Sequence, residues 1–282
     1  MKTNSSVQRA INVLELFTRL KDSYTLTEIS KKLNVNPATL MPVLHTLEKN
    51  EYLERDQETK KYSLGIKLME LGQLVSFRYD IRNRADKILR ELLMEIGLTI
   101  HLAIMEKGEI IYIDRKEASS KKLNPSWIGK RAPLHSTALG KALLAFSDSQ
   151  TVNNVKKYIT FEKFTEHTIT SWENLNKQLK EVRKQGYAID NEEHQKGGLC
   201  VGAPIFNHDG EVIAAISTSM IKSNTTDKKI KKVIQSLKKA AQDISISMGF
   251  NEKYNKVSFS EGDIKKITLI SKEDDKKYRF IK

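Results

Sequence analysis

Residues 25–50 read TLTEISKKLNVNPATLMPVLHTLEKN and carry the signals of two helices joined by a tight turn. Thr25, followed three residues later by Glu28, is typical of a capping box that opens the first of these helices. Asn36 as N-cap and Pro37 at the first helical position then begin the second helix. The second helix has a buried stripe that consists of Leu40, Leu44 and Leu47. This pair of helices predicts a helix-turn-helix.

The flanking residues extend this unit. Apolar residues recur at helical spacing from 7 to 17, so an amphipathic helix precedes the pair, and a loop follows it at residues 21–23. Two strand-like runs, 52–55 and 60–64, flank a short polar turn, which is typical of a β-hairpin. Residues 1–64 therefore predict a winged helix-turn-helix domain that binds DNA.

The face of the second helix opposite its buried stripe is free to enter a major groove. Thr39 and His45 can hydrogen-bond base edges or phosphates, while Ala38 and Met41 can contact thymine methyl groups. Pro42 removes one backbone hydrogen bond, and because it lies on the outward face we expect a bend rather than a break. Two lysines of the hairpin can pair with phosphates. The predicted DNA-binding set is Ala38, Thr39, Met41, Pro42, His45, Lys60 and Lys61.

The remainder of the chain divides into three parts. Residues 65–78 predict a linker helix that is apolar on much of its circumference, and such a helix needs a partner, most economically a second copy of itself. Residues 79–250 combine amphipathic helices with strands, which predicts a larger mixed α/β domain with an antiparallel sheet and an α+β class for the whole chain. Residues 251–282 form an extension of unknown role that either pairs as an extra hairpin or is disordered.

Four polar residues of the larger domain fall on neighbouring predicted strands. Ser217 and Ser219 are two apart on one strand, so their side chains point to one face, and Asp190 and Cys200 lie on or beside adjacent strands. The helix that begins near residues 137–140 offers backbone N–H groups without partners, which suit a carboxylate or phosphate. A buried cysteine is usually a small hydrophobe, however, so the spacing leaves open whether these groups share a pocket.

Composition excludes several classes of protein. The 282 residues fit two domains, and 39% hydrophobic and 29% charged residues with 5 prolines exclude collagen-like and disordered chains. No apolar run approaches a membrane helix, and the start MKTNSSVQRA has no signal-peptide core, so we expect a cytoplasmic protein with no membrane partner. The single cysteine, Cys200, cannot form an internal disulfide, and no cluster has zinc spacing, so we predict no metal and no cofactor.

The net charge of +13 suggests nucleic-acid binding, but it is spread thinly. Residues 1–78 hold 12 Lys and Arg against 9 Asp and Glu, a net charge of +3. Of the 48 basic residues 37 are lysines, which is typical of a solvated surface. DNA recognition therefore has to rest on a few placed residues.

Catalytic motifs are missing from the sequence. There is no Walker loop, no Gly-x-Gly-x-x-Gly, no Gly-x-Ser-x-Gly and no His-Glu-x-x-His. His194 lies six residues before Cys200, but a lone histidine in the loop-like stretch HQKGG is more often a surface residue than half of a nucleophile pair. We predict no catalytic residue and no enzyme.

Two blocks of sequence, in this order, resemble the IclR (isocitrate lyase regulator) family of bacterial transcription factors. The first comprises SVQRAINVLELF, LTEISKKLNVNPATLMPVLHTLEKNEYLER and KYSLGIKLMELG, which are similar to the family's winged helix and linker helix. The second comprises GKRAPLHSTALGKALLAF and GYAIDNEEHQKGGLCVGAPIFNHDGEVIAAIS, which are similar to its effector-binding domain. The resemblance covers roughly residues 5–249.

The resemblance implies a homodimer, often paired into a tetramer as a dimer of dimers, and a small-molecule effector in the second domain. In members that bind small acids such as glyoxylate or pyruvate, an Asp, a Cys and two Ser contact the ligand, helix-start amides hold its carboxylate, and an apolar loop covers it. The positions here that match are Ala138, Leu139, Asp190, Cys200, Ser217, Ser219, Trp127, Ile128 and Gly129. One departure is the recognition helix, where many members have a Ser-Thr pair and an Arg while this chain has Ala38-Thr39 and Pro42, which implies a different operator.

We interpret the chain as a ligand-responsive DNA-binding regulator, a repressor of a catabolic operon that senses a small organic acid and binds a double-stranded DNA operator. Two other interpretations remain open at this point. One is a small-molecule enzyme that uses Cys200, with the winged helix serving only assembly. The other is a sensor that acts through protein partners, which would show no sequence preference on DNA.

Overall fold

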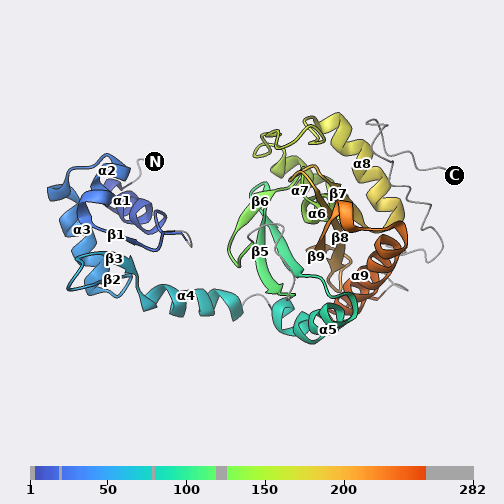
Figure 1. The fold of residues 1–282 in the computed structure, drawn as a ribbon, viewed down its shortest axis with the longest axis horizontal. Coiled ribbons are helices and arrows are strands. Elements are labelled where there is room, and N and C mark those ends of the chain that lie inside the picture. Colours follow the sequence, from blue (N-terminus) through green and yellow to red (C-terminus); the bar gives the residue numbers. More distant parts are fainter. Residues whose placement is uncertain (1–3, 19–20, 78–79, 119–125, 252–282) are drawn as a thin grey trace. The chain divides into compact units, whose positions relative to one another are not determined.

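The computed structural model describes residues 4–18, 21–77, 80–118 and 126–251, which form two compact units that meet in sequence at Asp80 and Ile81 (Figure 1). The extension predicted over 251–282 lies outside the described residues apart from Asn251.

The first unit is a small helical domain with a short sheet. Its elements are α1 (Ser5–Leu14), β1 (Ser23–Tyr24), α2 (Leu26–Leu33), α3 (Pro37–Lys49), β2 (Leu53–Arg55) and β3 (Tyr62–Leu64). The three strands pair antiparallel in the order β1-β3-β2. Ser23, which the sequence analysis assigned to a loop, pairs with Ser63 in this sheet. The predicted helices and hairpin are therefore present, and the loop assignment of Ser23 was wrong.

The helix ends of this unit follow the capping signals in the sequence. The capping box at the start of α2 is formed, with the Thr25 N–H donating to Glu28 Oε2 at 2.8 Å and the Glu28 N–H donating to Thr25 Oγ1 at 3.3 Å. Asn34 ends α2 in the left-handed conformation at φ 52°, and Asn36 Oδ1 accepts from the N–H of the second residue of α3 at 2.9 Å. Pro42 does not interrupt α3.

A linker helix, α4 (Ile66–Phe77), follows the winged domain. Its apolar side chains remain at the surface, with Met69 exposed to 63% and Leu74 to 64%. Removing exposed apolar side chains from water is favourable, so the apolar surface of α4 is suited to contact with a partner.

The second unit is built on one antiparallel sheet of order β6-β5-β4-β9-β8-β7. The strands are β4 (Ile100–Glu106), β5 (Glu109–Lys116), β6 (Arg131–Pro133), β7 (Ala188–Asn191), β8 (Gly198–Phe206) and β9 (Val212–Ile221). The helices are α5 (Asp80–Ile96), α6 (Ala138–Phe146), α7 (Ser149–Val155), α8 (Trp172–Gln185) and α9 (Asp227–Ser247), with a 3₁₀ turn at Lys222–Asn224. The sequence analysis predicted neither β6 nor α7.

Helices cover both faces of the central strands. Alternate sheet residues such as Ala103, Ala188 and Ala215 pack with α6 and α8 in one cluster, and the opposite face packs against α9. As a result β8 is buried at eight of its nine positions, although antiparallel strands often leave one face in water. None of the helices in the described residues is long and apolar enough to cross a bilayer.

Candidate functional site

The floor of a cavity in the second unit is formed by two adjacent rows of side chains across the sheet. In one row Asp190 of β7 lies opposite Cys200 of β8, which lies opposite Ser219 of β9. Ser217 and Gly202 occupy the next row, because residues two apart on a strand share a face.

This second row continues across the sheet toward β5. Ser217 pairs with His101 of β4, and His101 pairs with Arg115 of β5. The antiparallel register thus brings residues from four separate parts of the sequence onto one surface.

The N-terminal end of α6 forms the roof. Thr137 caps this helix, since its Oγ1 accepts from the Gly140 N–H at 3.1 Å and donates to the Pro133 carbonyl at 2.7 Å. The first two N–H groups, of Ala138 and Leu139, have no acceptor among the described residues. They are therefore positioned to hold an anion.

A glycine allows this helix end to lie so close to the sheet. A Cβ atom on Gly202 would lie 2.7 Å from the Ala138 carbonyl oxygen, closer than real Cβ contacts. The close packing of α6 on β8 therefore requires glycine at this position.

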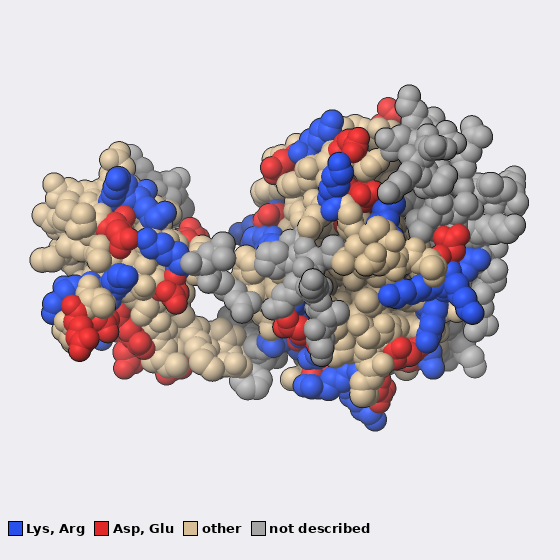
Figure 2. All heavy atoms as spheres, in the orientation of Figure 1, with Lys and Arg blue, Asp and Glu red and all other residues tan. Residues whose placement is uncertain are grey.

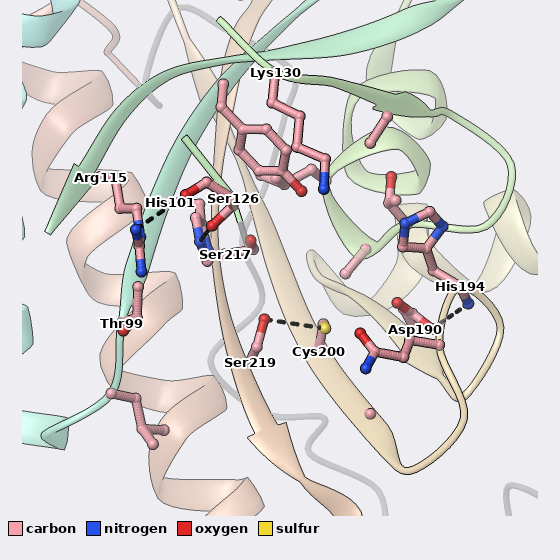
Figure 3. A pocket seen from close by; sticks show the side chains of 18 residues that line it. Thr99, His101, Arg115, Ser126, Lys130, Asp190, His194, Cys200, Ser217 and Ser219 are labelled. Carbon is pink, nitrogen blue, oxygen red and sulfur yellow. Dashed lines mark hydrogen bonds between the residues drawn. The ribbon is translucent and has the colours of Figure 1, made fainter. Parts of the chain in front are cut away.

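The cavity measures about 90 Å³. In Figure 3, Asp190 and His194 lie on one side of it, and His101, Arg115, Ser126 and Ser217 gather on the other. The lining residues are Leu98, Thr99, His101, Tyr112, Arg115, Ser126, Lys130, Ala132, Thr137, Ala138, Leu139, Asp190, His194, Gln195, Gly198, Cys200, Ser217 and Ser219. At roughly 10–15 Å³ for each water-sized position, the cavity has room for about six to nine non-hydrogen atoms.

Asp190 is the only carboxyl among the lining residues. Its Oδ1 accepts from the backbone N–H groups of Glu193 at 2.8 Å and His194 at 3.3 Å, while burial raises the pKa of the carboxyl above its ordinary value. The amides fix the position of Asp190 on the cavity wall, and its charge is poorly solvated there.

Cys200 lies partly buried beside Asp190, and its thiol donates to Ser219 Oγ at 3.2 Å. Burial and the neighbouring carboxylate raise the pKa of this thiol well above its ordinary value. The thiolate form is therefore disfavoured, and the thiol hydrogen bond goes to a serine rather than to a histidine. These conditions oppose a nucleophilic role.

Two histidines of the cavity are neutral at physiological pH. Burial lowers the pKa of His101 to about 4, with Arg115 and Lys130 contributing, and it lowers the pKa of His194 to about 4 as well. The remaining full charges on the wall are the cationic Arg115 and Lys130 and the carboxyl of Asp190. The balance favours an anionic ligand.

Six of the nine positions that match the family's effector contacts line this cavity, namely Ala138, Leu139, Asp190, Cys200, Ser217 and Ser219. Trp127, Ile128 and Gly129 are not among the described residues that form the wall, and their neighbours Ser126 and Lys130 line it instead. Ile128 is 51% exposed, and the Trp127 ring instead lies 5.0 Å from the Lys130 amine.

The expectation that His194 is a surface residue was wrong. The turn after β7 brings its Nδ1 to 3.2 Å from Ser136 Oγ and its ring into the cavity wall. His101 on β4 and the β5 residues Tyr112 and Arg115 were not predicted from the sequence, because β4 pairs with β9, and β5 with β4, only in the folded sheet.

The first unit presents the predicted DNA-binding residues at its surface. The side chains of Ala38, Thr39, Met41, Pro42 and His45 on α3 are all exposed, while Leu40, Leu44 and Leu47 are buried as predicted. Lys60 and Lys61 are exposed in the turn between β2 and β3. This turn is organised by Asp56, whose Oδ1 accepts from the Thr59 N–H at 2.6 Å.

Charged side chains of both signs lie on the face that Figure 2 shows. Figure 2 shows basic and acidic side chains interspersed over both units on the face in view. A weakly polarised surface agrees with the net charge of +3 over residues 1–78.

Comparison with known proteins assigns both units. Residues 6–57 match the IclR helix-turn-helix domain, and residues 73–246 match the domain described as bacterial transcriptional regulator IclR C-terminal. The HTH-type transcriptional regulator XynR of Escherichia coli (strain K12) is 36% identical over 245 residues, which cover 87% of this chain and 97% of XynR.

Further relatives agree with this assignment. The HTH-type transcriptional regulator KdgR of the same organism is 34% identical over 248 residues, 88% of this chain and 94% of KdgR. The crystal structure of the Thermotoga maritima IclR aligns with a TM-score of 0.75 and 32% identity, and it covers 87% of this chain and 99% of that one. The chain therefore belongs to the IclR family of bacterial transcriptional regulators.

Proposed function

We propose that this protein is a repressor of a catabolic operon that binds an operator through α3 and binds a small carboxylic acid in the cavity of its second unit. The observation that carries the proposal is the cavity, where free helix-start amides meet the row Asp190, Cys200 and Ser219. A repressive sign is supported by relatives such as the HTH-type transcriptional repressor AllR of Salmonella typhimurium, which is 27% identical over 88% of this chain.

Operator reading is assigned to α3 and to the turn between β2 and β3. Thr39 and His45 contact base edges, Ala38 and Met41 contact thymine methyl groups, and Pro42 shapes the exposed face. Lys60 and Lys61 pair with phosphates and add affinity without reading sequence.

The effector carboxylate binds to the N–H groups of Ala138 and Leu139. Helix-start amides and the positive end of the helix dipole favour an anion there. Asp190, Cys200, Ser217 and Ser219 contact the remainder of the ligand, and Trp127 and Ile128 have no assigned contact. The volume of about 90 Å³ limits the acid to a small one.

The functional form is a homodimer, with a dimer of dimers as the larger assembly. The exposed apolar side chains of α4, which include Ile66 at 50% and Met69 at 63%, support a helix pair between two copies. We place the DNA-binding domain at 1–64, the linker helix at 65–78 and the effector domain at 79–250.

The effector acts by its different affinity for two arrangements of the DNA-binding domains. A tenfold change in operator affinity requires about 1.4 kcal/mol of coupling, which is within the range that one small ligand supplies.

The test starts with genome-wide mapping of bound DNA, followed by operator titration with the purified full-length protein. We expect specific binding that weakens steeply with salt and a change of at least fivefold on adding an acid from a panel of short carboxylates. Asp190→Asn should remove the response to the acid and retain operator binding. The matched control is Asp209→Asn, the same substitution at an exposed aspartate outside the cavity, which should change neither. Binding without sequence preference, or a response to no acid in the panel, would refute the proposal.

No observation favours a cysteine-dependent enzyme. The thiol of Cys200 has a raised pKa, because burial and the neighbouring carboxylate of Asp190 disfavour the thiolate, and it donates to Ser219.

A further inference from the structure

Three polar groups on the cavity wall have no hydrogen-bond partner among the described residues. They are the hydroxyls of Tyr112 and Ser217, two residues that line the cavity, and the buried Nε of Arg115. Ser217 is only 4% exposed, and Arg115 Nε is buried. Polar groups inside a protein are nearly always paired, so these three groups point to a partner that the described residues do not supply.

Other polar groups of the wall are already engaged. Ser126 Oγ lies 2.7 Å from His101 Nε2, Thr137 Oγ1 donates to a carbonyl, and Ser219 Oγ accepts from the Cys200 thiol. The unpartnered groups are therefore a specific subset of the polar wall.

The three groups surround one residue, His101. Ser217 and Arg115 are its neighbours on β9 and β5 in the sheet, and the Tyr112 ring lies 5.3 Å from the His101 ring. We call Tyr112, Arg115 and Ser217 the hydroxyl subsite. Figure 3 shows Ser217 and Arg115 on the same side of the cavity, away from Asp190 and His194.

The electrostatics of the hydroxyl subsite suit neutral oxygens better than a second carboxylate. Burial raises the pKa of Tyr112 above its ordinary value, so its hydroxyl keeps the proton, and His101 is neutral because burial lowers its pKa to about 4. The charge of Arg115 is shared with Glu117, 3.3 Å from its guanidinium. Two hydroxyls that both donate and accept, together with one N–H donor, match ligand hydroxyl groups.

We propose that the hydroxyl subsite binds hydroxyl groups of the effector, which is accordingly a short hydroxylated carboxylic acid rather than an unsubstituted aliphatic or aromatic acid. This inference rests on the proposed function, because it takes the carboxylate to be held at the start of α6. Room for about six to nine non-hydrogen atoms corresponds to an acid of about three or four carbons with its hydroxyls.

An acid without hydroxyls would leave these three groups without a ligand partner. Sites built to bond a hydroxyl reject the analogue that lacks it by up to about 10⁴- to 10⁵-fold, and part of this is lost where water can enter. We therefore expect about 100-fold discrimination here.

The test uses matched acids on the full-length protein. Glycerate is compared with propionate, and threonate with butyrate, by isothermal titration. The hydroxylated acid should bind about 100-fold more tightly than its partner in at least one pair. Tyr112→Phe should reduce that ratio at least tenfold by weakening only the hydroxylated acid, and Tyr158→Phe, at a side chain that is 57% exposed, should leave the ratio unchanged.

Several results would overturn the assignment. Equal affinity within both pairs, no binding in either pair, or an unchanged ratio in Tyr112→Phe would each exclude the hydroxyl subsite. Ser217→Ala repeats the test if the ligand-free Tyr112→Phe protein melts at a lower temperature. If benzoate or butyrate shifts operator binding and the hydroxylated acids do not, the subsite fails and the proposed function stands. If no acid shifts operator binding, both fail.

Discussion

A buried ion pair beside the cavity allows a quantitative test of how the second unit is held together. Lys141 of α6 is fully buried, and its amine donates to the carboxylate of Glu193 and, at 2.8 Å, to Gln178 of α8. The second oxygen of Glu193 is buried with no partner in the described residues, and burial raises the pKa of this carboxyl to about 7. The pair connects α6, whose first residues roof the cavity, with the turn whose amides hold Asp190.

Lys141→Met removes the ammonium and leaves Glu193 buried without a counter-charge. Removal of one partner of a buried pair costs about 3–5 kcal/mol, and we expect this loss of unfolding free energy at pH 8. At pH 5.5 Glu193 is protonated in the folded protein, so Lys141→Met leaves no buried charge there. The loss of unfolding free energy should then be about 1–2 kcal/mol, which is the contribution of the lost hydrogen bonds. When Glu193→Gln is added to Lys141→Met, the free energy of unfolding of the double variant should return to within about 1 kcal/mol of the original chain. Replacing both partners of a buried pair is often neutral.

Urea unfolding followed by tryptophan fluorescence measures this directly, because both tryptophans, Trp127 and Trp172, lie in the second unit. The four proteins of the cycle are compared at pH 5.5 and pH 8. A double variant as unstable as Lys141→Met, or a single-variant loss that does not change with pH, would refute the reasoning.

Four other substitutions test the site and the DNA-binding face. Gly202→Ala should destabilise the second unit by about 1–3 kcal/mol and weaken acid binding at least tenfold, since the new Cβ would lie 2.7 Å from a backbone oxygen; unchanged melting and titration curves would contradict this. The pKa of His194 falls from 6.5 to about 4 on folding, so it contributes stability above pH 6.5 that is lost as the pH falls toward 4. His194→Gln should remove about 2 kcal/mol of acid sensitivity, measured by urea unfolding at pH 7 and 4.5. Thr39→Ala and His45→Ala should each weaken operator binding about tenfold in a fluorescence-anisotropy titration, and an equal loss on unrelated DNA would assign them to phosphate contacts.

The first unit was predictable because its helix ends are encoded locally. The Thr25–Glu28 capping box and the Asn36-Pro37 start depend on side chains within three residues of the backbone groups that they satisfy. The two-residue strand Ser23–Tyr24 has no pattern of its own, and it exists only because β3 offers it hydrogen bonds. Local chemistry therefore predicts the helices, and tertiary pairing decides the short strand.

The cavity was predictable only in part, because most of its wall depends on tertiary pairing rather than on local chemistry. Ser217 and Ser219 share a face by strand geometry alone, whereas Arg115 reaches the same row through two strand pairings that span about a hundred residues of sequence. His194 lies in the wall after a turn in which Glu192, two residues before it, takes a positive φ of 58°. Trp127 and Ile128 precede Gly129 at φ 88°, and in the described loop Ser126 and Lys130 point inward instead. Such choices of direction are not visible in residue spacing.

The weak charge of the DNA-binding domain bears on how the proposed repressor is regulated. A net charge of +3 over residues 1–78 gives each domain little non-specific attraction to phosphates, so one domain alone binds weakly. In the proposed dimer, affinity then depends on engaging both half-sites at once, and it falls sharply when their spacing no longer matches. A ligand that biases the placement of the two domains by about 1.4 kcal/mol can therefore change occupancy tenfold without touching α3. Under the proposed function, the low charge that makes DNA binding hard to recognise from composition also makes operator affinity sensitive to a small acid.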